Sequence, residues 1–167
     1  MKVENLSDIL EIAVRIERDG VELYRRLYEK SVSPQAREIF SSLAAEEERH
    51  LGAFRQMLER VATYTPRYSY PGEYGMFIEG VAARVIERAQ ITSQFEATDD
   101  VAALMDAALS LESETLLFYL DCGQHAQDEQ LKRGIQTIID EEKQHWVRLL
   151  KLKRRLCADS AKKNKAH

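Results

Sequence analysis

The sequence "EEERH" (residues 46–50) lies in the middle of a long helical pattern and places a histidine three residues after a glutamate. The sequence "EEKQH" (residues 141–145) repeats this arrangement in a second helical pattern. Side chains three positions apart are neighbours on a helix, so Glu47 and His50 can reach the same small volume. Because the other positions on this side of the helix are apolar, the pair is expected to point into a protein core.

Around these two stretches the chain reads as a set of long helices, because glycine and proline are scarce and clustered. Ser33 is a good N-cap for one of them, with Pro34 at its first position. The tyrosine-rich segment 63–75 contains prolines and glycines and is not expected to form regular helix. We predict long helices at 5–30, 34–62, 100–124 and 128–156, and a shorter amphipathic helix at 76–91.

Each of the four long helices carries a seam of apolar residues spaced three and four apart, which is typical of a four-helix bundle. At one level every seam is acidic, and this level is duplicated in the sequence. A shift of 95 residues places Glu17 on Glu112, Glu47 on Glu142, His50 on His145 and Tyr24 on Tyr119. Two similar helical hairpins are therefore expected to face each other. The long connection over 63–100 favours a crossover topology.

Four carboxylates and two imidazoles at one level of a core require compensation. Burying one unpaired charge costs several kcal/mol, whereas a whole domain is stable by only about 5–15 kcal/mol. Two divalent cations would balance the four negative charges. Mixed carboxylate and imidazole ligation suits iron or manganese. One Glu from each of two helices and Glu-x-x-His from each of the others is also the ligand plan of ferritin-like dimetal bundles.

At this point the chain resembles the rubrerythrin-type dimetal-carboxylate proteins of the ferritin-like superfamily, over about residues 5–156. The resemblance lies in "IERDGVELYRRL" (16–27), "FSSLAAEEERHLGAF" (40–54), "ALSLESETLLFY" (108–119) and "IIDEEKQHWVRLL" (138–150). It implies an all-α, ferritin-like four-helix bundle with a long crossover between the second and third long helices and a short accessory helix.

The resemblance also implies a role for each residue of the acidic level. Glu47 and Glu142 would bridge two metal ions, and Glu17 and Glu112 would be terminal carboxylates. His50 and His145 would each complete the shell of one metal. The four glutamates are thus the expected catalytic groups as well as ligands. The peroxidase members carry a rubredoxin-type iron site with two Cys-x-x-Cys pairs, which this chain lacks.

The function implied by the resemblance is that of a non-haem di-iron oxidoreductase. It would carry out redox chemistry on Fe(II) with O2 or hydrogen peroxide, as a ferroxidase or in peroxide reduction. Two iron ions are expected, with manganese, a mixed Fe/Mn pair or zinc as other occupants. An external electron donor must act in trans, because no electron-transfer cofactor motif is present. A non-catalytic metal-binding or assembly module, or a dimanganese catalase-type enzyme, are the alternatives.

Several residues beside the ligand candidates have two interpretations. Tyr24 and Tyr119 are either core aromatics whose hydroxyls bind a neighbouring carboxylate, or donors that orient a metal ligand or supply a transient electron. Glu46, Glu48 and Glu141 flank the ligand candidates but are expected to face away from the seam, on a solvated surface. An iron-entry path is the alternative interpretation of these three glutamates.

Composition bounds the remaining expectations. The net charge of −4 gives no support for a nucleic-acid partner, and no apolar run is long enough to span a membrane. The two unpaired cysteines and the lack of a signal-like N-terminus favour a cytoplasmic location. We expect one bundle domain over 1–157 and a basic, disordered tail over 158–167. The apolar side of 76–91 needs cover, so a homo-oligomer, dimeric or higher, is expected.

Overall fold

The computed structural model describes residues 6–62, 72–94, 101–126 and 129–165, and nearly all of these are helical. The helices are α1 (Leu6–Lys30), α2 (Pro34–Ala62), α3 (Gly72–Gln94), α4 (Val101–His125) and α5 (Glu129–Lys165). No strand occurs in these ranges. The predicted all-α class is confirmed.

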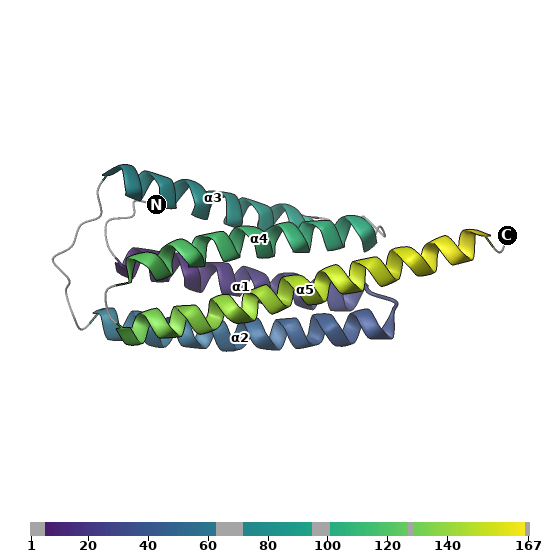
Figure 1. The fold of residues 1–167 in the computed structure, drawn as a ribbon, viewed down its shortest axis with the longest axis horizontal. Helices are drawn as coiled ribbons and strands as arrows, with labels where there is room; N and C mark the ends of the chain where they lie inside the picture. Colours follow the sequence, from purple (N-terminus) through teal and green to yellow (C-terminus); the bar gives the residue numbers. More distant parts are fainter. Residues whose placement is uncertain (1–5, 63–71, 95–100, 127–128, 166–167) are drawn as a thin grey trace.

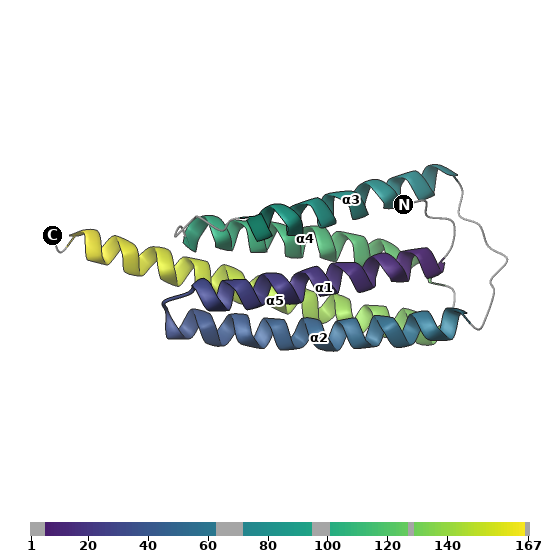
Figure 2. The ribbon, with the colours of Figure 1, turned by 180° about the vertical axis from the view of Figure 1, so that it is seen from behind.

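Four of the helices, α1, α2, α4 and α5, lie side by side as an elongated bundle (Figure 1). α1 and α2 run in opposite directions, and so do α4 and α5. Helix α3 runs the length of the bundle on its outside and packs against α1 and α4, as seen from both sides (Figures 1 and 2). As a result α2 and α4 run in the same direction, which is the predicted crossover topology.

The predicted ends of the first long helices agree with the structure. The hydroxyl of Ser33 accepts a hydrogen bond of 3.4 Å from the backbone N–H of Ala36, as expected of an N-cap that precedes Pro34. Helix α1 ends at Lys30, also as predicted. The tyrosine-rich residues 63–71 lie outside the described part of the chain.

Two helices are longer than predicted, α3 at both ends and α5 at its C-terminal end. Helix α3 begins at Gly72, inside the segment 63–75 that was expected to be irregular, because glycine is tolerated in the first turn of a helix. Helix α5 continues to Lys165, whereas the sequence predicted that this helix ends at 156. The reason is that residues 157–165 contain neither glycine nor proline, so nothing in them terminates the helix. The last two residues of the predicted tail, 166 and 167, lie outside the described part of the chain.

The bundle core is built from the apolar seams of the helices, which the structure buries on either side of the acidic level. The largest fully buried side chains come from all five helices and include Leu10, Phe40, Phe54, Ile78, Met105 and Ile135. Because apolar residues enclose the acidic level along the bundle axis, its charged groups are removed from bulk water.

Helix α3 buries Ile78, Ala82 and Val85. Near the start of α3, Met76 is 73% exposed and Phe77 is 50% exposed. The buried residues of α3 pack against α1 and α4. A homo-oligomer stays a prediction.

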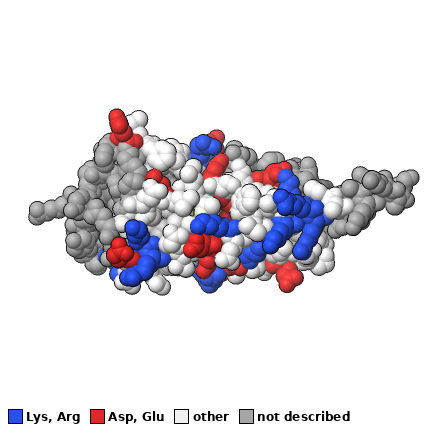
Figure 3. Space-filling view, in the orientation of Figure 1, with Lys and Arg blue, Asp and Glu red and all other residues white. Residues whose placement is uncertain are grey.

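The surface is mixed in charge, with Lys and Arg side chains gathered toward the end where α5 leaves the bundle (Figure 3). Lys151, Arg154 and Arg155 are exposed on this part of α5. Among the described helices, none is both long and apolar enough to cross a membrane.

Candidate metal centre

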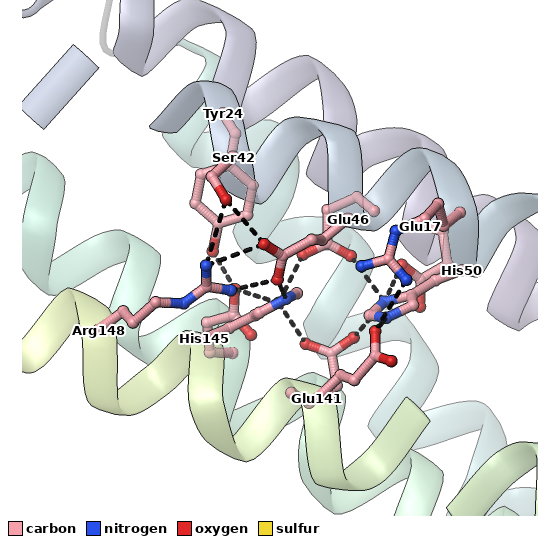
Figure 4. Close-up of polar contacts among 12 residues, drawn as sticks. Glu17, Tyr24, Ser42, Glu46, His50, Glu141, His145 and Arg148 are labelled. Carbon is pink, nitrogen blue, oxygen red and sulfur yellow. Dashed lines mark hydrogen bonds and ion pairs between the residues drawn. The ribbon is translucent and has the colours of Figure 1, made fainter. Parts of the chain in front are cut away.

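The structure brings all six predicted ligand residues together at one level of the bundle. Helices α1 and α4 each contribute one glutamate, and α2 and α5 each contribute a glutamate and a histidine one turn later. Each of the six is at most 3% exposed: Glu17, Glu47, His50, Glu112, Glu142 and His145. Residues from opposite ends of the sequence therefore form one buried polar cluster, part of which is shown in Figure 4.

The cluster divides into two overlapping groups of potential ligands. One consists of Glu17, Glu47, His50 and Glu142, and the other of Glu47, Glu112, Glu142 and His145. Within each group the ligand atoms lie within 4.8 Å of one another. Glu47 and Glu142 belong to both groups, so the geometry offers two adjacent cation positions that share two carboxylates.

Both histidines point Nδ1 toward the centre of the cluster. In His50 this atom lies 2.9 Å from Glu142 Oε1 and 3.4 Å from Glu47 Oε2. In His145 it lies 3.0 Å from Glu47 Oε1 and 3.1 Å from Glu142 Oε2. The two imidazole rings are stacked with their centroids 5.4 Å apart. Each histidine thus faces the two carboxylates that the groups share.

Several buried atoms in this cluster make no hydrogen bond with any described residue. They are Glu17 Oε2, Glu112 Oε2, Glu142 Oε1, His50 Nδ1 and His145 Nδ1. The Nδ1 atoms lie near carboxylate oxygens but are not aligned for hydrogen bonds. An unsatisfied buried polar group costs about 1–3 kcal/mol. Five of them aimed at one small volume fit bound cations, whose ligand bonds would satisfy these atoms.

The electrostatics of the cluster follow from the burial of four carboxyls at one level of the core. Burial and the charge of Glu47 raise the pKa of Glu17 well above its ordinary value. Burial also raises the pKa of Glu112, and the charge of Glu142 adds to it. Burial would raise the pKa of Glu47 as well, but the proton held by Glu17 and the contact with His145 outweigh it and lower this pKa. Protons on Glu17 and Glu112 therefore reduce the negative charge of the cluster.

The histidines respond in the opposite sense. Burial lowers the pKa of His145, but its contacts with Glu142 and Glu47 outweigh this and raise the pKa to about 11. The pKa of His50 is raised for the same reason, through Glu142 and Glu17. A site that holds extra protons on its carboxyls and imidazoles without metal is one in which cations can replace those protons.

The two tyrosines singled out in the sequence each reach across the bundle to a glutamate. The hydroxyl of Tyr24 on α1 donates to Glu112 on α4, and that of Tyr119 on α4 donates to Glu17 on α1. Burial is the largest cause that raises the pKa of each tyrosine. Both hydroxyls remain protonated donors at neutral pH. Both interpretations of these residues include this hydrogen bond.

The expectation that Glu46 and Glu141 face solvent is wrong. Glu46 Oε2 lies 2.8 Å from His145 Nε2, and Glu141 Oε2 lies 2.9 Å from His50 Nε2. Each glutamate thus orients a histidine on the facing helix, which is the usual role of a carboxylate behind a ligand histidine. The 95-residue shift maps Glu46 onto Glu141 and could have revealed this pair. Glu48 is half-exposed and pairs with Arg25, as expected for a solvated position.

The hydrogen bonds from Arg148 and Ser42 explain why Glu46 is ionised. Burial would raise the pKa of Glu46, but hydrogen bonds from Arg148 and Ser42 outweigh it and lower the pKa to about 2. Figure 4 shows this carboxylate between the guanidinium of Arg148 and the ring of His145. Because Glu46 accepts the Nε2–H, the Nδ1 atom of His145 is the one directed toward the cluster.

Comparisons with known proteins agree with this arrangement. The family model described as Rubrerythrin matches residues 8–153, a range that includes all six ligand candidates. A crystal structure of a ferritin-like diiron-carboxylate protein from Thermotoga maritima is similar, with a TM-score of 0.66 and 24% sequence identity. The similarity covers 92% of this chain and 95% of that chain and shows the shared ferritin-like fold. No curated protein matches the chain.

Proposed function

Because the chain belongs to the rubrerythrin family, we propose that its buried cluster holds two iron ions and supports redox chemistry on Fe(II) with O2 or hydrogen peroxide. The observation that carries this proposal is the pair of overlapping ligand groups at the bundle centre. Two Fe(II) ions bring four positive charges to four carboxylates, so the buried level becomes neutral with both histidines uncharged.

Each residue of the cluster has a role in this proposal. Glu47 and Glu142 belong to both groups and would bridge the ions. Glu17 and His50 would complete one position. Glu112 and His145 would complete the other. Tyr24 and Tyr119 hold the terminal glutamates from the opposite hairpin, so each terminal carboxylate has one oxygen fixed, and the other is buried without a hydrogen bond to any described residue.

A bound iron pair would supply two electrons, one from each ion, which is the number needed to reduce one hydrogen peroxide, with two protons, to two waters. The protein keeps bulk water away from the site, since none of its six ligand candidates is more than 3% exposed. Electrons for a further turnover would come from a donor in trans or from fresh Fe(II), because Cys122 and Cys157 form no Cys-x-x-Cys pair.

The test begins with iron content. The protein is loaded anaerobically with Fe(II), desalted and analysed for metal, beside Glu47→Ala, Glu142→Ala and a Glu48→Ala control. Glu48 is the matched control because it lies next to Glu47 on α2 but points outward to Arg25. We expect about two iron ions per chain in the wild type and in the control, and a loss in the other two variants.

Mixing the loaded protein with O2 or with hydrogen peroxide then separates the reactions. Formation of Fe(III) with either oxidant supports the proposed chemistry, and the faster oxidant identifies the substrate. Turnover of peroxide by manganese-loaded protein without reductant would indicate a catalase-type enzyme instead. No bound transition metal after loading with Fe(II) and Mn(II) would contradict the proposal and leave an assembly module.

A further inference from the structure

In each of the two histidines of the metal centre, the Nε2 atom contacts a carboxylate outside the cluster. The two carboxylates differ in the residues that fix them in place. His145 is held by Glu46, and His50 is held by Glu141. In both pairs the carboxylate lies on the helix that faces the histidine. The difference bears on the affinity of the two metal positions, so its consequence rests on the proposed function.

On the His145 side, Glu46 is fixed at both oxygens. Its Oε1 accepts a hydrogen bond of 2.9 Å from Arg148 Nη1 and one of 2.7 Å from the hydroxyl of Ser42. Its Oε2 accepts from Arg148 Nη2 and from His145 Nε2. The contact between guanidinium and carboxylate is bidentate, and this geometry holds a carboxylate in one orientation. The side chains of Glu46 and Arg148 are 20% and 33% exposed.

On the His50 side, the support is looser. Besides His50, Glu141 pairs with Arg49, whose Nη1 lies 3.3 Å from Oε2. This is the same oxygen that contacts His50. The Arg49 side chain is 60% exposed, and that of Glu141 is 30% exposed. A single, long and exposed ion pair contributes about 0–1 kcal/mol and fixes its carboxylate weakly.

The sequence duplication shows that the tight support exists on one side alone. The 95-residue shift maps Glu46 onto Glu141, so the carboxylates are duplicated. It maps Arg148 onto Ala53, which carries no charge. It also maps Ser42 onto Thr137, whose hydroxyl donates instead to the backbone oxygen of its own helix. Among the described residues, His145 therefore has behind it a carboxylate fixed at both oxygens, and the equivalent His50 does not.

We propose that the two metal positions differ in affinity, and that Arg148 makes the position of His145 the tighter one by fixing Glu46. A ligand already held in its binding orientation loses less conformational freedom when the metal binds. Residues behind a ligand histidine typically change metal affinity by about 10–100-fold. Arg148 is thus a positioning residue: it acts on the metal through Glu46 and His145.

The test is an anaerobic titration of the full-length, metal-free protein with Co(II), followed by visible absorption and by competition with a chelator. We expect two equivalents to bind to the wild type in two steps, with dissociation constants at least about tenfold apart. Arg148→Ala should weaken the tighter step by about 10–100-fold and alter the spectrum of the first equivalent. The matched control is Arg49→Ala, which removes the exposed arginine on the His50 side and should leave both steps within about threefold.

Three further variants sharpen the assignment. Arg148→Lys keeps the charge but loses the bidentate contact, so its tighter step should lie between those of the wild type and Arg148→Ala. His50→Ala should keep the Co(II) spectrum of the first equivalent, whereas His145→Ala should lose it. If Arg148→Ala does not fold, Glu46→Gln against Glu141→Gln makes the same comparison, and Glu46→Gln should weaken the tighter step more.

The outcomes distinguish the unequal affinities from the proposed function. A wild-type chain that binds fewer than two Co(II) ions and fewer than two Fe(II) ions overturns both. Two equivalents bound with equal affinity overturn only the inequality of the two positions. Equal effects of Arg148→Ala and Arg49→Ala overturn the role of Arg148. Melting curves of the metal-free variants show whether each one is folded before it is titrated.

Discussion

The α1–α2 hairpin and the α4–α5 hairpin present the same residue types to the metal centre but differ in what lies behind them. Each supplies two glutamates and one histidine to the cluster. Each also sends one tyrosine across to a glutamate of the other hairpin. The match ends behind the two carboxylates that hold the histidines, since Arg148 in the second hairpin corresponds to Ala53 in the first. The duplicated residues are those that a two-cation site requires.

Neither hairpin builds a complete cation position by itself. The group around His50 takes Glu142 from the second hairpin, and the group around His145 takes Glu47 from the first. Bound cations would therefore tie the two hairpins together at the middle of the bundle. The two hairpins match in their ligand candidates and in Glu46 and Glu141. They differ in the residues that hold these two carboxylates.

The largest expected effect separates the shared glutamates from the unshared ones. Glu47→Ala or Glu142→Ala should weaken both metal positions by at least about a hundredfold, more than outer residues contribute. Glu17→Ala or Glu112→Ala should weaken mainly one position. The measurement is the metal content per chain after desalting. Retention of one tightly bound ion by Glu47→Ala would contradict the assignment of this residue to both groups.

Metal removal tests whether the cations tie the hairpins together. Two ions, each at about 100 times its dissociation constant, add about 5 kcal/mol to the free energy of unfolding. For a chain of this size that corresponds to about 10–20 °C in the melting temperature. Calorimetry with and without a chelator measures the difference. A melting temperature that does not change on chelation would mean that metal does not link the hairpins.

The pH dependence of the metal-free protein should be the reverse of ordinary carboxylate behaviour. The pKa values of Glu17 and Glu112 are raised by burial, so the folded chain keeps protons that the unfolded chain releases above about pH 4.5. Stability from these groups is present below that pH and is lost as pH rises through the raised pKa values. The raised pKa of His145 acts in the same direction above about pH 6.5.

Melting curves between pH 6 and pH 8 check this prediction. The metal-free wild type should lose stability over this range, by about 1 kcal/mol for each pH unit per proton released. Glu17→Gln and Glu112→Gln should each flatten the dependence, one from either hairpin. A metal-free protein that becomes more stable toward pH 8 would show that these carboxyls are not protonated together.

The six ligand candidates could be predicted because helical periodicity and the 95-residue duplication select the same positions. The roles of Glu46 and Glu141 were missed because helical spacing predicts only whether the position of a residue on the helix faces the core. A glutamate side chain is long enough to reach from the flank of one helix to a histidine on the next. The bidentate contact of Arg148 depends on how α2 and α5 pack, which no local pattern contains.

The helix ends also show which features the local sequence pattern predicts and which it does not. The end of α1 and the start of α2 follow local rules, and the cap at Ser33 was predicted. The end of α5 was predicted wrongly because the last residues were expected to fray or to be disordered, as chain termini often are, although the segment has no helix-breaking residue. A position near the terminus does not end a helix when the intrinsic propensities still favour it.

A smaller effect is expected from the two tyrosines, and it should be equal in both hairpins. Tyr24→Phe and Tyr119→Phe each remove a hydroxyl that fixes a terminal glutamate. The loss of about 1 kcal/mol per hydrogen bond corresponds to about a fivefold weaker metal position. Co(II) titration measures it, with Tyr28→Phe on the surface of α1 as the control. Effects that differ by more than about a factor of ten would extend the inequality of the hairpins to the tyrosines themselves.

The smallest effect concerns a core position that both hairpins fill differently. Cys122 on α4 maps onto Leu27 on α1, and both are buried, at 3% and 2% exposed. Burial, with the charge of Asp121, raises the pKa of the Cys122 thiol. The reactive thiolate is therefore scarce at pH 8 as well as shielded. Native protein treated with iodoacetamide should be alkylated at the exposed Cys157 and not at Cys122, as mass spectrometry can show. Rapid alkylation of Cys122 would contradict this prediction and mean that the α4–α5 hairpin opens enough to expose the thiol.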